Sequence, residues 1–136
     1  MARNRAHDAS SLIAFLANEE GAELVSRVLA DQDDPSYAHA LNVAEVYKYF
    51  ALTVSIEAAI EALARIRLAG VIIGEDMDEA LWRHAVQLRV DYGRMAMADA
   101  IGMAFATRLS ADFLTADRAE LEKVERAQGC LITFIR

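Results

Sequence analysis

Short apolar runs alternate with segments of helical periodicity along the chain, and this alternation restricts the fold more than any other feature. Runs suited to strands lie at residues 5–8, 36–41, 71–73, 112–114 and 130–135. Helical spacing lies between them, at residues 10–17, 21–29, 77–92, 97–109 and 117–127, and in two helices that begin after caps at Asn42 and Ser55. Strands that alternate with helices in this way pair in parallel and carry helices on both faces. The sequence therefore predicts a small α/β sandwich.

The length and composition limit the alternatives. A chain of 136 residues suffices for one core and is too short for two, so we expect one domain over residues 1–136. Apolar residues make up 55% of the chain, which excludes disorder. The single cysteine, Cys130, excludes a disulfide framework and a cysteine-based zinc site.

Charge and hydropathy limit where the protein can act and which partners it can bind. The formal net charge of −7 argues against a protein that coats nucleic acid with its whole surface. No stretch approaches the roughly 20 apolar residues of a membrane span, and no targeting segment is visible. We expect a cytoplasmic protein without membrane contact.

Most of the acids have the setting of solvated helix faces, as do Glu57, Glu61, Glu120, Glu122 and Glu125. Four acids differ because their neighbours are small or apolar, and these are Asp8, Glu45, Asp99 and Asp117.

Asp8 lies at the end of the first predicted strand, and Asp117 lies just beyond the fourth. Ligands of open parallel sheets bind beyond the carboxyl ends of the strands, so neighbouring strands would bring the two carboxylates into one crevice, where Asp99 could join them. Repulsion among the carboxylates favours a hard cation with oxygen ligands, Mg²⁺ or Mn²⁺. The alternative for each acid is a helix cap, as Asp117 could be for the helix that follows it.

Four segments resemble the PIN domain, and most closely the VapC-type toxin ribonucleases of toxin–antitoxin pairs. They are DASSLIAFL at residues 8–16, NVAEVY at 42–47, ADA at 98–100 and LTADR at 114–118, and the resemblance runs from residue 5 to residue 135. It implies a three-layer sandwich with a mainly parallel sheet of strand order 3-2-1-4-5. Carried over residue by residue, it matches Asp8, Glu45, Asp99 and Asp117 to the family's acidic quartet, and Ser10 and Thr115 to its supporting hydroxyls.

The chain departs from the family pattern at two places. Arg5, Ala6 and His7 stand where members usually have a β-branched apolar strand, which predicts a thin or partly polar first strand. Ala119 stands where many members carry a further acid, with Glu120 next to it, so binding of a second metal ion stays open.

We therefore expect an endoribonuclease that depends on Mg²⁺ or Mn²⁺ and acts as the toxin of a type II toxin–antitoxin pair. Asp8, Asp99 and Asp117 would hold the metal, and Glu45 would share its shell or orient the attacking water. Four cationic residues are equally well read as RNA phosphate contacts or as solvated surface: Lys48, Arg94, Arg108 and Arg118.

The resemblance also implies partners other than RNA. An antitoxin would insert an Arg or Lys near the acidic site, where carboxylates attract a guanidinium as readily as a metal. Met95, Met97 and Met103 lie at helical spacing and are read as core or dimer contacts. A homodimer would cover the methionine-rich residues 95–105, which we expect to leave apolar surface.

Two other function classes compete with the nuclease. A non-catalytic binding or assembly module could keep the same fold, but it has no reason to keep all four acids. A serine hydrolase or a phosphate-binding enzyme is disfavoured, since neither a Gly-x-Ser-x-Gly elbow nor a Gly-rich phosphate loop occurs.

Overall fold

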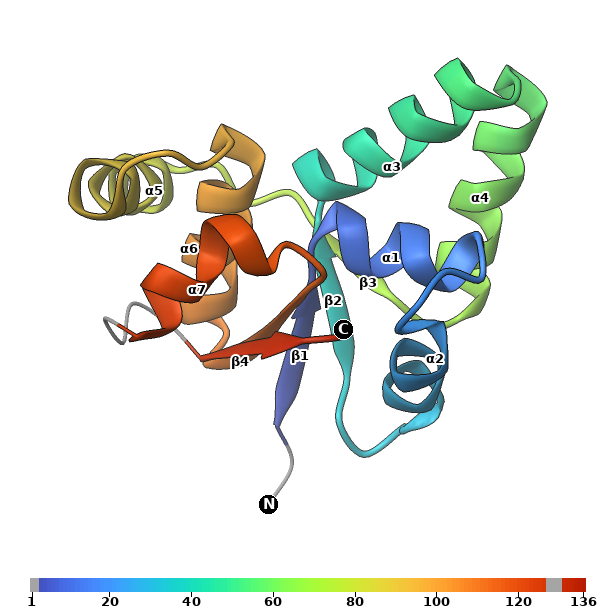
Figure 1. Cartoon of the computed structure of the whole chain (residues 1–136), viewed down its shortest axis with the longest axis horizontal. Helices are drawn as coiled ribbons and strands as arrows, with labels where there is room; N and C mark the ends of the chain where they lie inside the picture. Colours follow the sequence, from blue (N-terminus) through green and yellow to red (C-terminus); the bar gives the residue numbers. More distant parts are fainter. Residues whose placement is uncertain (1–2, 127–130) are drawn as a thin grey trace.

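A five-stranded parallel sheet forms the middle layer of the protein (Figure 1). The computed structural model describes residues 3–126 and 131–136. The strands are β1 (Asn4–His7), β2 (Ser36–His39), β3 (Ile72–Gly74), β4 (Ala111–Thr115) and β5 (Ile132–Phe134), and they lie in the order β3-β2-β1-β4-β5. Every pairing is parallel; Ala6, for example, lies opposite Tyr37 on one side and Phe113 on the other. The predicted α/β class and the strand order implied by the resemblance are confirmed.

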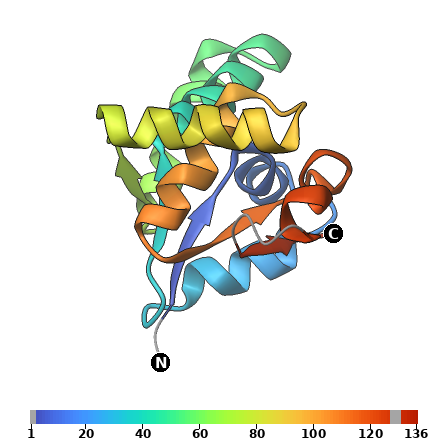
Figure 2. The same cartoon turned by 90° about the vertical axis from the view of Figure 1, so that its left-hand side faces the viewer.

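Helices cover both faces of this sheet, as Figures 1 and 2 show from two directions. The helices are α1 (Ala9–Leu16), α2 (Ala22–Ala30), α3 (Ala40–Thr53), α4 (Ile56–Leu68), α5 (Glu79–Tyr92), α6 (Met97–Arg108) and α7 (Arg118–Arg126). On one side lie α1, α2 and α4, and on the other lie α5, α6 and α7 (Figure 1). The remaining helix, α3, starts at the end of β2, contacts α6 and then runs outward beside α4.

Side-chain alternation along the strands separates the two halves of the core. Phe113 of β4 faces α6 and packs in the cluster that holds Ile101 and Met103. The next residue, Leu114, faces α1 and packs with Val25. This alternation assigns successive side chains of β4 to the two faces of the sheet.

Helix α6 is the most deeply buried helix of the described residues, with every position of its segment Ala100–Ala106 buried. Met95 and Met103 are also buried, so the methionine-rich residues 95–105 belong largely to the core. The expectation that this stretch leaves apolar surface for a dimer to cover is wrong for most of its length, since only Ala96 and Met97 are exposed. The reason is that α6 lies between the sheet and α5 and is apolar around most of its circumference.

The first strand is short and polar, as its sequence predicted, and each polar side chain has a partner. Asn4 Nδ2 donates to the carbonyl oxygen of Leu109 at 2.8 Å, and Arg5 pairs with Asp34 at 2.8 Å. His7 is fully buried on the α1 side, with Nδ1 2.9 Å from Ser11 Oγ and Nε2 3.1 Å from Ser36 Oγ. These contacts allow β1 to occupy the centre of the sheet without β-branched residues.

Two predicted element boundaries need correction. Strand β2 ends at His39, whose Nδ1 accepts a hydrogen bond from the Leu41 backbone and caps α3, so Asn42 is not the cap. Ser55 caps α4 as predicted.

The end of the predicted helix at residue 127, and the start of the last strand at Cys130, lie outside the described residues. Within the described ranges, no helix has both the length and the apolar character needed to cross a membrane.

Candidate functional site

Acidic side chains gather beyond the carboxyl ends of the two central strands, β1 and β4. Asp8 follows β1, and its backbone N–H donates to the carbonyl oxygen of Leu114, which continues the ladder between the strands. Thr115 ends β4, and Asp117 lies two residues beyond it. Because the two strands are neighbours, Asp8 and Asp117 meet at one edge of the sheet.

Asp8 is buried and held by three hydrogen-bond donors. Its Oδ1 accepts from Ser10 Oγ at 2.7 Å and from the Ser11 backbone at 2.9 Å, which makes Asp8 the N-cap of α1. Its Oδ2 accepts from Thr115 Oγ1 at 2.5 Å. Burial raises the pKa of Asp8 to about 6, although the three hydrogen-bond donors lower it. The charge of Asp117 raises the pKa further.

The hydroxyls of Ser10 and Thr115 each contact the Asp8 carboxylate and the backbone after β4. Ser10 Oγ accepts from the Ala116 N–H at 2.8 Å, and Thr115 Oγ1 accepts from the Asp117 N–H at 2.9 Å. Since both hydroxyl protons point to Asp8, the network fixes the position of the loop that carries Asp117 relative to Asp8.

Three further carboxylates form a compact group. Asp99 of α6, Asp117 and Glu120 each offer an oxygen, and these oxygens lie within 4.8 Å of one another. The Glu120 backbone donates to Asp117 Oδ1 at 3.1 Å, so Asp117 also caps the start of α7.

The sequence analysis placed Glu120 on a solvated helix face, and this prediction is wrong because Glu120 lies in the carboxylate group. A residue three positions after an N-cap returns to the capped end of the helix, and this spacing from Asp117 was the available signal.

The surrounding carboxylates all raise the pKa of Asp99, which lies in the first turn of α6. Its pKa is raised to about 7, first by burial and then by four nearby negative charges, those of Asp8, Asp117, Glu120 and Glu45. Glu45 itself is exposed on α3. The structure therefore brings the four sequence-predicted acids into one electrostatic neighbourhood and adds Glu120 to them.

Asn42 lies beside this group although sequence reasoning treated it only as a cap. It is buried, and its Nδ2 donates to the carbonyl oxygen of Ala98 at 3.2 Å. Its Oδ1 is the one buried side-chain oxygen or nitrogen of the described residues that lacks a hydrogen-bond partner.

The donor set of this site suits a hard divalent cation. The four charged side chains that act on the pKa of Asp99 are all carboxylates, and a cluster that raises this pKa to about 7 gains from a positive charge. Oxygen ligands without nitrogen or sulfur favour Mg²⁺ or Mn²⁺ over zinc or copper.

Two of the proposed phosphate-contacting residues have other partners. Arg108 Nη1 lies 2.5 Å from Asp78 and 3.2 Å from Asp76, at the far end of α6 from Asp99. The guanidinium of Arg118 lies 4.4 Å from the centre of the Phe134 ring and donates to the Arg136 carbonyl oxygen. Lys48 and Arg94 are exposed.

Comparison with known proteins places this geometry in a structural context. A family model of the PIN domain matches residues 7–127. No curated protein matches the sequence.

Solved structures with the same fold include three toxin–antitoxin proteins. The Mycobacterium tuberculosis VapC20 toxin, described as cleaving the sarcin-ricin loop, has a TM-score of 0.71 at 16% identity, over 87% of this chain and 93% of that chain. A toxin–antitoxin complex from Klebsiella pneumoniae has a TM-score of 0.72 at 15% identity, over 97% and 98%. DNA-bound VapBC from Salmonella typhimurium has a TM-score of 0.73 at 14% identity, over the full length of both chains.

Proposed function

The chain belongs to the PIN-domain family, and we propose that it is a divalent-metal-dependent endoribonuclease that acts as the toxin of a type II toxin–antitoxin pair. The observation that carries the proposal is the group formed by Asp99, Asp117 and Glu120, with one oxygen of each within 4.8 Å of the others. Asp8 lies next to this group at the end of the central strand. The VapC20 toxin, which shares the fold, is described as cleaving RNA of the sarcin-ricin loop, which supports RNA as the substrate class.

We assign the metal ligands to Asp8, Asp99 and Asp117, with Glu120 as a further ligand. Asp8 uses both oxygens as acceptors, but Oδ2 accepts only from Thr115 and keeps a lone pair for a cation. A Mg²⁺ or Mn²⁺ ion bound there supplies Lewis acidity, which lowers the pKa of water and offsets negative charge on a phosphodiester.

The protein's own side chains then contribute position and proton transfer. Ser10 and Thr115 hold Asp8 and the loop before Asp117 in one arrangement. Glu45 is the exposed member of the acidic set, which supports our assignment of its carboxylate to orient the attacking water and accept its proton. The water oxygen would bond to phosphorus as the bond from phosphorus to a ribose oxygen breaks, and that oxygen would take a proton from solvent while Glu45 later releases the proton it accepted.

The antitoxin belongs to the same proposal. Solved relatives of this fold are toxin–antitoxin complexes, and a crowded carboxylate group without metal attracts a guanidinium or ammonium group. We propose that an Arg or Lys of the antitoxin enters the acidic group, that the chain forms a homodimer, and that it acts in the cytoplasm.

The test is cleavage of labelled RNA by the purified chain. Cleavage should require Mg²⁺ or Mn²⁺, stop with EDTA, and fall by at least about 100-fold in the Asp99→Asn and Asp117→Asn variants. Glu61→Gln, on the exposed side of α4, removes the same charge and should cleave like the wild type. If no RNA is cleaved and the metal does not raise the melting temperature, the non-catalytic module becomes the better interpretation.

A further inference from the structure

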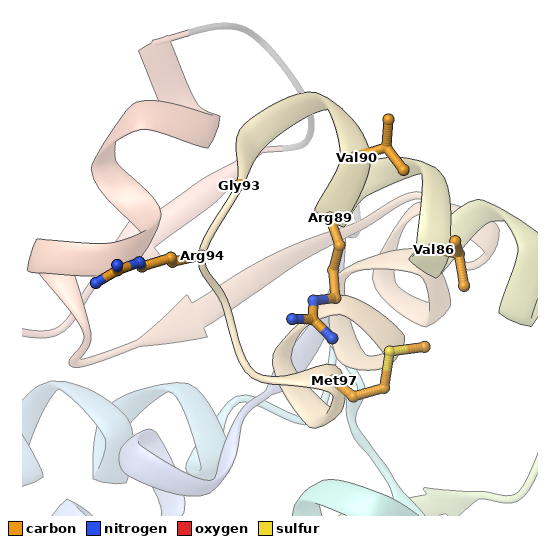
Figure 3. Close-up of a pocket in the computed structure, with 6 residues that line it drawn as sticks. All are labelled: Val86, Arg89, Val90, Gly93, Arg94 and Met97. Carbon is orange, nitrogen blue, oxygen red and sulfur yellow. The ribbon is translucent and has the colours of Figure 1, made fainter.

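A hollow of about 380 Å³ opens between the end of α5 and the start of α6. Its lining is Val86, Arg89, Val90, Gly93, Arg94 and Met97. In Figure 3, the Arg89 side chain extends into the space framed by the end of α5 and the loop that leads to Met97. Arg94 extends from that loop on the opposite side.

Both arginines of this hollow are available to an anion. Arg89 and Arg94 are exposed, and in the part of the chain that the structure describes no carboxylate lies within 4 Å of either guanidinium. Arg108, by contrast, is bound by two aspartates. Among the described residues, Arg89 and Arg94 thus offer the hollow two guanidiniums without a carboxylate partner.

The rest of the hollow is apolar and exposed. Val86, Val90 and Met97 have relative exposures of 44%, 72% and 37%. Val86 and Val90 lie one turn apart on α5, so their side chains form a continuous surface beside Arg89. An apolar surface next to a guanidinium suits the flat face of a nucleobase joined to a phosphate.

The hollow and the acidic group share structural elements. Met97 opens α6, and Asp99 follows two residues later in the same helical turn. Lys123 of α7 donates to the Arg94 carbonyl oxygen at 3.3 Å, which ties the loop of the hollow to the helix whose first turn holds Glu120. The hollow and the acidic group are thus built on the same two segments, the start of α6 and helix α7.

We propose that this hollow binds a nucleotide that flanks the cleaved bond of single-stranded RNA, with its phosphate on Arg89, its base on Val86, Val90 and Met97, and a neighbouring phosphate of the same strand on Arg94. The inference rests on the proposed ribonuclease function, because that function brings an RNA strand to Asp99. The hollow supplies the cationic contact that the acidic group lacks, so it explains how an acidic protein holds a polyanion.

RNA fits the hollow better than a second copy of the chain does. A twofold contact centred on the hollow would place four guanidiniums, Arg89 and Arg94 of each copy, in one interface. Like charges face each other at such an interface and cost binding energy. A phosphate group neutralises the same guanidiniums.

The experiment measures binding of a fluorescent single-stranded RNA 12-mer to the full chain in EDTA, over a series of salt concentrations. In the Arg89→Gln/Arg94→Gln variant, the dissociation constant should rise about tenfold or more, and the slope of log K against log salt should fall by about two. Val90→Ser should weaken binding without changing the slope. The control is Arg83→Gln, which also removes one positive charge from α5, but at a residue that pairs with Glu79. This variant should bind RNA like the wild type.

Three outcomes decide the matter. If the double variant binds RNA with unchanged affinity and slope while the wild type cleaves RNA with Mn²⁺, the inference is wrong and the proposed function stands. If the wild type neither cleaves nor responds to metal, the proposed function fails, and arginine-dependent binding then still supports the hollow as an RNA site. If the variants change sedimentation of the protein and leave RNA affinity unchanged, the hollow is a contact between copies and the proposal is overturned.

Discussion

Asn42 Nδ2 donates a hydrogen bond to the carbonyl oxygen of Ala98 at 3.2 Å, and this contact fastens α3 to the first turn of α6. Glu45 lies one turn after Asn42, and Asp99 directly follows Ala98. The contact therefore sets the spacing between the helix that carries Glu45 and the helix that carries Asp99. Close approach needs Gly102, since a Cβ there would lie 2.6 Å from Asn42 Oδ1 and 3.0 Å from the Phe113 ring.

Gly102→Ala should lower the free energy of unfolding by about 1–3 kcal/mol, because the added methyl group enters occupied space. Asn42→Ala removes the nearest of the crowded atoms, so the double variant should be more stable than the sum of the single effects by at least about 0.5 kcal/mol. Urea unfolding of the four proteins measures this coupling. Strict additivity would show that Asn42 and Gly102 do not determine each other's position.

The α/β class was predictable because strand and helix periods alternate. The positions of Asp8 and Asp117 after their strands also predicted which end of the sheet carries the acids. The resemblance supplied the strand order. Two features were missed for physical reasons. The proximity of Glu120 to Asp117 depends on helix-cap geometry rather than on composition, and the choice of His39 over Asn42 as the cap of α3 depends on where β2 ends.

The sequence interpretation left open whether the methionines of α6 pack in the core or at a dimer contact, although the sequence carries a signal for the core. Met97–Arg108 has apolar or small residues around nearly its whole circumference, which is typical of a helix enclosed by the core rather than of a surface stripe. Methionine-rich composition alone does not distinguish a core helix from an interface.

Millimolar Mn²⁺ or Mg²⁺ should raise the melting temperature of the wild type at neutral pH, because a cation binds the acidic group only in the folded state. At a hundredfold excess over Kd, the gain corresponds to about 2.7 kcal/mol. Asp117→Asn and Glu120→Gln should each reduce this rise, because each removes one oxygen donor of the group.

The control for the metal response is Glu61→Gln, which removes an exposed charge of α4 far from the sheet edge and should keep the full rise in melting temperature. An equal rise in all variants would indicate metal binding elsewhere on the surface. No rise in the wild type would remove the metal site from the proposed function.

Thr115→Val should destabilise the protein by about 1–3 kcal/mol at neutral pH, because it leaves the buried Asp8 Oδ2 without its donor. The Thr115 hydroxyl lowers the pKa of Asp8, so its loss should raise that pKa further and make the effect larger at pH 8 than at pH 5. Thr115→Ser keeps the hydroxyl and should restore most of the stability. Thermal melts at the two pH values measure both effects, and a pH-independent loss would contradict the role of the hydroxyl in holding a charged Asp8.

The pH dependence of stability contains terms of opposite sign. Burial lowers the pKa of His7 to about 4, so the unfolded chain binds its proton first, and this term destabilises the fold as pH falls from about 6.5 to about 4. Asp8 and Asp99 act in the opposite sense, because their raised pKa values mean that the folded state holds more protons between about pH 4 and pH 7. In that window the carboxyls destabilise the metal-free fold as pH rises.

Asp99→Asn isolates one of these terms, since His7 and Asp8 remain in both proteins. The pKa of Asp99 rises from 3.8 to about 7 on folding, so its charged form costs up to about 4 kcal/mol above that pH and nothing below about pH 4. The stability of Asp99→Asn relative to the wild type should therefore increase steadily from pH 4 to pH 8 in EDTA, as measured by urea unfolding, and Mn²⁺ should reverse the order at pH 8. Glu61→Gln should show no such trend, and a flat difference between Asp99→Asn and the wild type would mean that Asp99 is not confined among carboxylates.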